Sequence, residues 1–537
     1  MWRFRMNALV IPCLLLVSCV SGFSQDKCQK LSALKIADTT IASAQGFAAG
    51  AFVGTPAPFS GADLTALYKT LPPFCHVVAV AKPTADSDIK IEIWLPSSGW
   101  NGKLQGIGNG GFAGLIDEMQ LGVALKHGYA ATATDTGHTG SPIDAAWALG
   151  HPEKVIDFGN RGVHEMTRVA KAVVKAYYAK APRRSFFAGC SDGGREALME
   201  AQRYPEDYDG ILAGAPANNW TPLLTTAAYD TQALTMDAAS FIPPAKIATI
   251  ADAVNKACDG LDGVRDGILN DPRQCQFDPA TIQCKGEDSD KCLTAAQVVT
   301  LKKLYAGTPD SSGQVVFPGY LPGAEEGQGG WGLWITGPAP GKSLMAAFAN
   351  GFFSAFVYEK SDWDLKTFGV DAGLKAATEK TAQALNATDL DLKAFQARGG
   401  KLILYHGWND PAISAMNTVN YYESLIQRMR QKEVDSFARL YMVPGMQHCG
   451  DGPGPNSFGQ VGELKFDDPT HSVDAALERW VEKGEAPGKI IASKAASKGA
   501  EKEKMTRPLC PYPQSAKYKG SGEANDAGSF ACEAREK

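Results

Sequence analysis

Residues 185–204 read SFFAGCSDGGREALMEAQRY and join a short apolar run, a glycine-rich turn and a helix-like segment. Within them, Gly189 to Gly193 match the pattern G-x-S-x-G around Ser191. A serine in this pattern lies in a strand-to-helix turn so sharp that the residues two before and two after it must lack side chains. The pattern therefore predicts a nucleophile elbow that presents the Ser191 hydroxyl at the C-terminal edge of a sheet. A tight turn with a solvated serine is the alternative interpretation.

Segments with the spacing of strands and of helices alternate on both sides of this turn. Apolar residues in alternation or in short runs predict strands at residues 89–95, 103–107, 129–134, 185–188, 210–213, 402–405 and 437–443. Apolar residues three and four apart predict helices at residues 163–177, 195–204, 419–429 and 473–481. Strands that alternate with helices in this way predict a parallel sheet of the α/β class.

The alternation fades between residues 217 and 397, where glycine, proline and aromatic residues are frequent. We interpret residues 217–397 as an insertion that lies over the sheet as a lid. The catalytic domain then comprises residues 25–216 and 398–537, and the whole chain is expected to adopt an α/β-hydrolase fold with a large lid insertion. Residues 494–504, rich in Lys and Ala, are expected to form an exposed loop or a short solvated helix.

In this fold class two backbone N–H groups from different loops stabilise the oxyanion that forms at the serine. The Asp192 N–H, next to the helix N-terminus, is one expected donor. The glycine-rich turn at residues 108–114 is expected to supply a second, through the N–H of Gly110 or Gly111. Residues 106–111 also satisfy G-x-G-x-x-G, but no helix with clear apolar periodicity follows them, so a dinucleotide-binding turn is the weaker interpretation.

The serine also needs a histidine base and an acid, which follow it in this fold class in the order acid, then histidine. Three histidines follow Ser191. His471 lies beside a helix start and is interpreted as a surface or capping residue. His406 ends a predicted strand and Asp410 lies four residues on, where the acid is expected. This leaves Asp410 as the acid and His448 as the base.

The N-terminus has the features of a secretory signal peptide, assigned to residues 1–24. Its apolar run, residues 8–17, is too short to span a bilayer. Cleavage near Gly22 or Ser24 is one outcome. The other is a lipoprotein signal in which Cys19 carries the lipid. No later segment is long and apolar enough to cross a membrane, so a secreted or periplasmic protein is expected.

Cysteine usage agrees with export. Twelve cysteines occur, Cys13 and Cys19 lie in the signal region, and an even number remains. An even number in an exported chain predicts disulfides, with plausible local pairs Cys258/Cys275, Cys284/Cys292 and Cys510/Cys532. Free buried thiols are the alternative. Zinc is disfavoured because the short C-x2–4-C spacing is missing.

Two further cysteines adjoin the proposed nucleophile and base. Cys190 precedes Ser191 and Cys449 follows His448. A disulfide between them would hold their Cα atoms roughly 4.4–6.8 Å apart and bring the serine and histidine into hydrogen-bonding range. The alternatives are two unrelated cysteines, or a redox pair.

An acidic, glycine-containing loop lies inside the lid segment. Residues 258–268 carry Asp259, Asp262 and Asp266. Alternating carboxylates and backbone carbonyls suit a hard cation, so Ca²⁺ is favoured over zinc, although the spacing is not that of an EF-hand. A Cys258–Cys275 bridge would close this loop. A solvated acidic turn is the alternative.

The elbow motif GCSDGG, Asp410 within HGWNDP and the adjacent His448 and Cys449 together resemble the tannase/feruloyl esterase family, from Cys28 to Cys532. The resemblance implies a Ser191-Asp410-His448 triad and Ca²⁺ bound by Asp259, Asp262 and Asp266 and by the carbonyls of Val264 and Ile268. It also implies the disulfides Cys28–Cys75, Cys190–Cys449, Cys258–Cys275, Cys284–Cys292 and Cys510–Cys532.

Members of this family act on gallate, hydroxycinnamate or terephthalate esters. Aromatic residues of the lid could stack on the acyl ring, namely Trp331, Trp334, Phe352, Phe353, Phe356, Tyr358 and Trp363. Packing in the lid core is the alternative for most of them. Among them, Trp331 and Phe356 are expected to contact the substrate, with His406 beside the acid loop. Residues 351–364 contain no arginine to pair with a free terephthalate carboxylate. The expected function is therefore a serine hydrolase of neutral phenolic esters, such as feruloyl or galloyl esters.

Other functions stay open at this point. They are a hydrolase of mono(2-hydroxyethyl) terephthalate-like esters, a peptidase or lipase, and an exported calcium-binding protein without catalysis. Lys and Arg number 53 against 58 Asp and Glu, a net charge of −5, which gives no reason to expect a nucleic-acid partner. The expected partner is a small aromatic ester, and the sequence specifies no oligomeric state.

Overall fold

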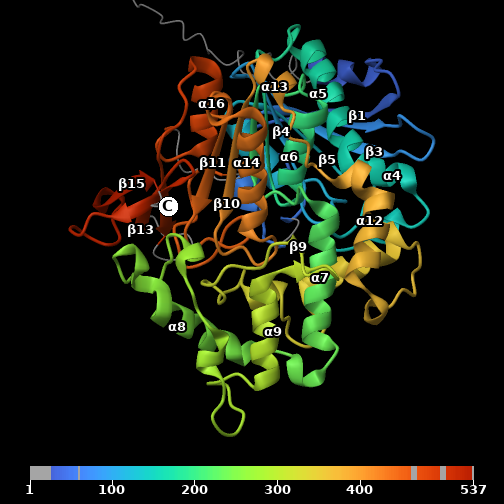
Figure 1. The fold of residues 1–537 in the computed structure, drawn as a ribbon. Coiled ribbons are helices and arrows are strands. Elements are labelled where there is room, and N and C mark those ends of the chain that lie inside the picture. The colour runs from blue at the N-terminus through green and yellow to red at the C-terminus, as the bar shows by residue number, and fades with distance from the viewer. Residues whose placement is uncertain (1–25, 58–60, 461–467, 496–502, 535–537) are drawn as a thin grey trace, which may run out of the picture.

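The computed structural model describes residues 26–57, 61–460, 468–495 and 503–534. The predicted signal peptide, including Cys19, therefore lies outside the described residues. A nine-stranded sheet forms the centre of the molecule, in the order β1-β2-β3-β5-β4-β6-β7-β10-β11 (Figure 1). Its strands are β1 Thr39–Phe47, β2 Phe74–Ala81, β3 Ile89–Pro96, β4 Lys103–Ile107, β5 Ala130–Thr134, β6 Arg184–Cys190, β7 Gly210–Gly214, β10 Lys401–Gly407 and β11 Ala438–Val443.

The sheet is parallel from β5 through β11. Strands β1, β2 and β3 add an antiparallel edge, paired through β3 with β5. Strands β1 and β2 are not among the predicted strands. The sequence of β1 is a weak signal because this edge strand buries Ile41 alone and leaves most of its other side chains exposed or half-buried. The α/β-hydrolase class predicted from the alternating segments is confirmed.

Helices cover both faces of the sheet because alternate residues of each strand point to opposite sides. Leu402 and Leu404 of β10 join one core, with α5 Gly162–Tyr178, α6 Asp192–Arg203 and α14 Ala415–Met429. Ile403 and Tyr405 join another core, with α16 Val473–Lys483. Helix α3 Glu118–Lys126 packs in a further core against β3 and β5. The predicted helices of this region are thus present, with bounds shifted by a few residues.

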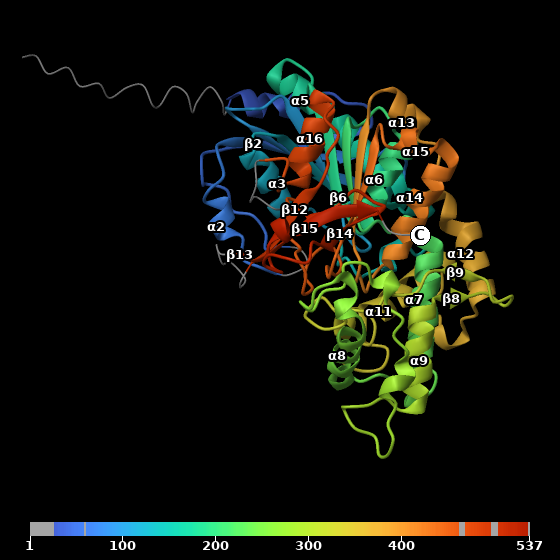
Figure 2. The ribbon, with the colours of Figure 1, turned by 60° about the vertical axis from the view of Figure 1, so that its left-hand side comes forward.

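Residues 217–385 build a largely helical layer at one end of the molecule, beyond the sheet (Figures 1 and 2). Its main helices are α7 Trp220–Thr235, α8 Ile247–Cys258, α9 Ala295–Ala306, α11 Leu344–Gly351 and α12 Val370–Leu385. One apolar core lies within this layer. A second joins it to the catalytic domain, where Phe112, Phe158 and Ile413 contribute to the same cluster.

The short α13 Lys393–Ala397, which leads into β10, lies beside the sheet, at the other end of the molecule (Figures 1 and 2). The predicted end of the lid at residue 397 is wrong, because Ala387, Leu392 and Phe395 are buried in the core of the catalytic domain. We call residues 217–385 the lid.

After α16 the chain forms two small antiparallel pairs, β12 Ile490–Ala495 with β13 Glu503–Leu509, and β14 Gln514–Tyr518 with β15 Phe530–Ala534. The exposed loop or solvated helix expected at residues 494–504 is wrong for the residues that the structure describes there, because residues 494–495 belong to β12 and residues 503–504 to β13. The reason is long-range: Ile490, Ala492 and Leu509 are buried against α16 and the sheet.

Five disulfides link the described residues, namely Cys28–Cys75, Cys190–Cys449, Cys258–Cys275, Cys284–Cys292 and Cys510–Cys532. These are the pairs that the family resemblance implies. Helices long and apolar enough to span a membrane are absent from the described part of the chain.

Candidate active site

The elbow around Ser191 has the geometry that its glycines predict. Ser191 joins β6 to α6 with φ +67°, in the left-handed region. A Cβ on Gly189 would lie 2.5 Å from the carbonyl oxygen of Gly193, and a Cβ on Gly193 would lie 2.8 Å from that of Asn109. The Ser191 N–H donates to the carbonyl of Gly214 on the neighbouring β7 at 3.0 Å. Any side chain at either glycine would therefore push the turn apart.

Asp410 and His448 come from the loops that follow β10 and β11. His448 Nδ1 lies 2.7 Å from Asp410 Oδ2. Asp410 Oδ1 accepts the N–H groups of Ala412 at 2.8 Å and Ile413 at 2.9 Å. Burial alone would raise the pKa of Asp410, but the charge on His448 and hydrogen bonds from two histidines outweigh it and hold that pKa below its usual value. The acid is thus fixed, ionised and aimed at one ring nitrogen.

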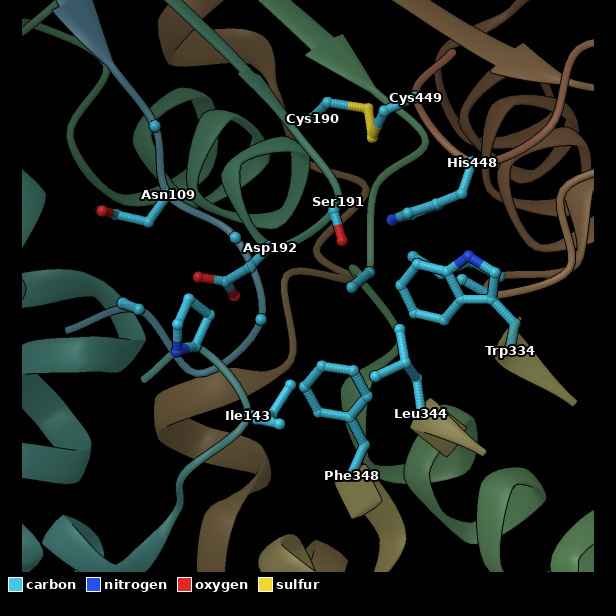
Figure 3. A pocket seen from close by; sticks show the side chains of 18 of the residues that line it. Asn109, Ile143, Cys190, Ser191, Asp192, Trp334, Leu344, Phe348, His448 and Cys449 are labelled. Carbon is cyan, nitrogen blue, oxygen red and sulfur yellow. A yellow bond between two sulfur atoms is a disulfide. The ribbon is translucent and has the colours of Figure 1, made fainter. Parts of the chain in front are cut away.

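Ser191 and His448 line one cavity, and their side chains point toward each other (Figure 3). The Cys190–Cys449 disulfide ties their chain neighbours together with a Cα–Cα distance of 6.0 Å. The serine comes from the β6 end and the histidine from the β11 end, 257 positions later in the chain. The structure therefore brings together all three residues expected to form the triad.

His406 does not contact the cavity, and its expected role in substrate binding is wrong. Its ring is fully buried, with Nδ1 2.7 Å from Thr418 Oγ1 on α14. Its Nε2 lies 3.1 Å from Asp410 Oδ2 and 3.0 Å from the carbonyl oxygen of Ile413. As a residue of β10, His406 points into the core behind the acid, where it supports Asp410.

Asp192, Gly110 and Gly111 also line the cavity, next to Ser191. Gly111 has φ +60°, and a Cβ there would lie 2.3 Å from the carbonyl oxygen of Pro142. Within the described part of the chain, the N–H groups of these three residues make no hydrogen bond to another protein atom. They are therefore available to an oxyanion beside Ser191.

The cavity measures about 690 Å³ and has mostly apolar walls. Leu344, Met345 and Phe348 of α11 line it from the lid, and Ile143 lines it from the catalytic domain (Figure 3). The ring of Trp334, also from the lid, lies edge-on to His448 with a centroid distance of 4.9 Å. Among the described residues that line the cavity there is no Lys or Arg.

Two expected substrate contacts, Trp331 and Phe356, lie elsewhere. Trp331 is 2% exposed and packs against Tyr305 and Tyr320 in the lid core. Phe356 is also 2% exposed and stacks on Phe112. Large aromatic side chains fill a lid core as readily as a cavity wall, so composition did not separate these roles. Leu344 and Phe348 are four residues apart, a spacing that predicts one shared helix face. The spacing does not predict that this face lines the cavity.

The acidic loop follows α8 in the lid. The N–H of Val264 donates to Asp262 at 3.1 Å, and the N–H of Ile268 donates to Asp266 at 3.1 Å. Asp259 Oδ1 accepts the N–H of Asp266 at 3.2 Å. The structure thus gathers the five residues expected to bind Ca²⁺ in one loop, although in the described part of the chain the three carboxylates do not all lie within 4.8 Å of one another.

The donor set of this loop fits a hard cation. Its donors are carboxylate and carbonyl oxygens, and burial raises the pKa of Asp262 to about 6. Arg507 of β13 contacts Asp266 at 2.5 Å and offsets one negative charge. Asn270, beside Asp262, is 3% exposed, and its side-chain amide has no hydrogen bond within the described residues. By contrast, Cys284 and Cys292 lie near Asp288 but are joined in a disulfide, which leaves no thiolate for a metal.

Comparison with known proteins gives consistent matches over most of the chain. Residues 75–533 match the family model for tannase and feruloyl esterase. An uncharacterized esterase of Xanthomonas campestris is 40% identical, over 94% of this chain and 91% of that protein. The mono(2-hydroxyethyl) terephthalate hydrolase of Piscinibacter sakaiensis is 34% identical, over 88% and 87%. A probable feruloyl esterase B-1 of Aspergillus terreus is 33% identical, over 85% and 86%.

Solved structures agree. Feruloyl esterase B of Aspergillus oryzae superposes with a TM-score of 0.86 at 28% identity, covering 95% of this chain and all of that one. The tannin acyl hydrolase of Aspergillus niger has a TM-score of 0.74 at 21% identity, covering 95% of each chain, and shares the fold. With the serine elbow and the disulfide beside it, these matches show that the chain belongs to the tannase and feruloyl esterase family.

Proposed function

We propose that this protein is a serine carboxylesterase that cleaves neutral esters of aromatic acids, such as feruloyl or galloyl esters. One observation carries the proposal: Ser191 and His448, with Asp410 behind the histidine, open onto an apolar cavity of about 690 Å³. Pockets of this size and polarity accept small aromatic ligands. The family membership gives ester hydrolysis as the reaction.

In the proposed reaction, Ser191 Oγ attacks the ester carbonyl while His448 Nε2 takes its proton. Asp410 stabilises the imidazolium through Nδ1. The N–H groups of Asp192 and of Gly110 or Gly111 stabilise the oxyanion. The C–O bond to the alcohol then breaks, His448 protonates the departing alcohol, and an acyl-enzyme remains. Water repeats the cycle and releases the aromatic acid.

Charge at the cavity favours a neutral substrate. Its described lining contains Asp117 and Asp192, the second of which is paired with Arg195 behind the cavity wall, and no basic residue except His448. A second carboxylate on the acyl ring, as in mono(2-hydroxyethyl) terephthalate, would enter a low-dielectric site without a cation to pair with it, which is costly. Hydrolysis of such half-esters is therefore the second candidate function, supported by the relative that carries it out.

The test is hydrolysis of methyl ferulate, methyl gallate and mono(2-hydroxyethyl) terephthalate by the purified protein, with Ser191→Ala as control. We expect turnover of a phenolic ester by the wild type alone, and a kcat/KM at least about tenfold lower for the terephthalate half-ester, since an unpaired buried charge costs more than 1.4 kcal/mol. Preference for the half-ester would overturn the neutral-substrate proposal. A fluorophosphonate probe that fails to label Ser191 would instead favour a non-catalytic binding protein.

We further propose that the acidic loop binds a structural Ca²⁺ through Asp259, Asp262, Asp266 and the carbonyls of Val264 and Ile268. The ion would supply positive charge to carboxylates that burial brings together. None of these five described residues lines the cavity at Ser191, which argues for a structural role. Chelation with EGTA should lower the melting temperature and added CaCl₂ restore it, whereas Asp262→Asn should show neither effect. A wild-type melting temperature that changes with neither EGTA nor CaCl₂ would refute the site.

We propose that the protein is exported. Five disulfides in one chain fit an oxidising compartment, and the N-terminal sequence fits a signal peptide. Intact mass of the mature protein distinguishes cleavage near Gly22 or Ser24 from a lipid-modified Cys19. A mature chain that still begins at Met1 would contradict export through this signal.

A further inference from the structure

Glu196 connects the nucleophile helix to the glycine-rich turn. It lies on α6, five residues after Ser191, and is 1% exposed. Its Oε2 accepts the backbone N–H of Asn109 at 2.8 Å, and its Oε1 accepts the Asn109 side-chain amide at 3.0 Å. One carboxyl group thus holds one residue of the turn by two separate bonds.

A third bond completes the connection. The N–H of Gly193 donates to the carbonyl of Asn109 at 2.8 Å. The contact is close: a Cβ on Gly108 would lie 2.8 Å from the Cα of Gly193 and 3.1 Å from Glu196 Oε2. Figure 3 shows Asn109 on the turn that runs past Asp192, with its side chain directed away from Ser191. We call these three hydrogen bonds the Asn109 clamp.

The clamp lies between the two groups that should stabilise the oxyanion. Asn109 directly precedes Gly110 on the turn, and α6 begins at Asp192. The clamp therefore fixes the distance between the Gly110 or Gly111 N–H and the Asp192 N–H. Donors to an oxyanion are effective only when they are held near their final position before the reaction.

We propose that Glu196 is a positioning residue, which sets the oxyanion donors on the glycine-rich turn relative to those at the elbow. The inference rests on the proposed esterase function. Glu196 does not touch the substrate in this proposal, and it acts through Asn109.

The other charges on α6 make different contacts. Arg195 pairs with Asp192 at 2.6 Å and donates a hydrogen bond to the carbonyl of Phe158. Its guanidinium is therefore directed to these groups, and the Glu196 carboxyl is left to bond Asn109. Burial, with the nearby Asp192 carboxyl, raises the pKa of Glu196 above its usual value. A glutamine matches this carboxyl in size and keeps one oxygen to accept the Asn109 N–H, and the Asn109 amide can rotate to present its own oxygen to the new amide group.

Glu200 offers a matched control. It lies one turn further along α6, is equally buried at 1% exposure, and lies near Asp207 rather than the glycine-rich turn. Truncation there creates a similar cavity in the same helix. A loss of activity caused by general loosening of α6 would therefore appear in both Glu196→Ala and Glu200→Ala.

The experiment measures kcat and KM for methyl ferulate in the wild type, Glu196→Ala, Glu196→Gln and Glu200→Ala. We expect Glu196→Ala to lower kcat about 10–100-fold with KM within about threefold, since oxyanion donors act mainly in the transition state. Glu196→Gln should return kcat to within about threefold of the wild type, and Glu200→Ala should stay within the same range.

An unchanged kcat in Glu196→Ala, an equal loss in Glu200→Ala, or a rise in KM alone would overturn the clamp. If Glu196→Ala fails to fold, Asn109→Ala replaces it, because that residue is half-buried on a turn. This variant should lower kcat about 3–10-fold at unchanged KM, and full kcat would refute the proposal. A wild type that neither turns over the ester nor reacts with a fluorophosphonate would instead overturn the esterase function, and the inference with it.

Discussion

The Cys190–Cys449 disulfide should contribute to stability and to catalysis in separable ways. It closes a loop with a sequence separation of 259 residues. In the chain-entropy model, a cross-link over a loop of that length stabilises the folded state by about 5.6 kcal/mol. The double variant Cys190→Ala/Cys449→Ala should lose stability of this order, because the unfolded chain regains the freedom to separate the two loops.

The catalytic effect follows from position. Cys190 and Cys449 are the immediate neighbours of Ser191 and His448, and the bridge holds their Cα atoms 6.0 Å apart. A displacement of about 1 Å between reacting groups costs up to about 100-fold in rate. We therefore expect kcat of the double variant to fall about 10–100-fold. The Asp410–His448 hydrogen bond should remain, because it joins the loops after β10 and β11 and does not depend on the disulfide.

The matched control is Cys284→Ala/Cys292→Ala, which opens a lid disulfide with a sequence separation of 8. The same model gives about 2.5 kcal/mol for so short a loop, and its kcat should be unchanged. Guanidinium denaturation without reductant measures the free energy of unfolding, and methyl ferulate hydrolysis gives kcat. Equal destabilisation of the two variants, or wild-type kcat without the Cys190–Cys449 bridge, would refute the reasoning.

Three further changes have defined expected results. Asp410→Asn should lower kcat about 10³–10⁴-fold at saturating ester, because the partner of His448 Nδ1 loses its charge; a loss below tenfold would remove Asp410 from the triad. Phe348→Ala should raise KM for methyl ferulate about tenfold through lost ring contact and leave ethyl acetate hydrolysis unchanged; equal effects on both esters would contradict an acyl-ring contact. Asp230 on α7 is 3% exposed, and burial raises its pKa to about 8. The folded state thus keeps a proton that the unfolded chain releases above about pH 4, so the free energy of unfolding falls as pH rises toward 8. Asp230→Asn should therefore raise the melting temperature more at pH 8 than at pH 5, and an equal shift at both pH values would contradict the burial argument.

Local signals in the sequence account for the parts of the site that depend on backbone form. The glycines around Ser191 predicted the elbow because no other residue fits a turn with these contacts. The order of acid and histidine after the serine then selected Asp410 and His448, and the hydrogen bond between them agrees with that choice. The adjacent cysteines predicted their own disulfide, since a covalent bond brings together segments that are far apart in the chain.

These local signals did not predict which side chains point into the cavity and which point into a core. His406, Trp331 and Phe356 have the residue types of a binding site, yet each points into a core, while Phe348 and Ile143 reach the cavity. The same holds for Glu196, an ordinary helix residue by sequence, whose partner Asn109 lies 87 positions earlier.

The sequence by itself thus determined the α/β class, the elbow, the order of the proposed triad and the family. Only the tertiary structure decided which lid side chains line the cavity and what holds the glycine-rich turn against α6. The physical reason is range: turn geometry and helical or strand periodicity are fixed by neighbours in the chain, whereas the direction a side chain faces depends on which distant segment packs against it.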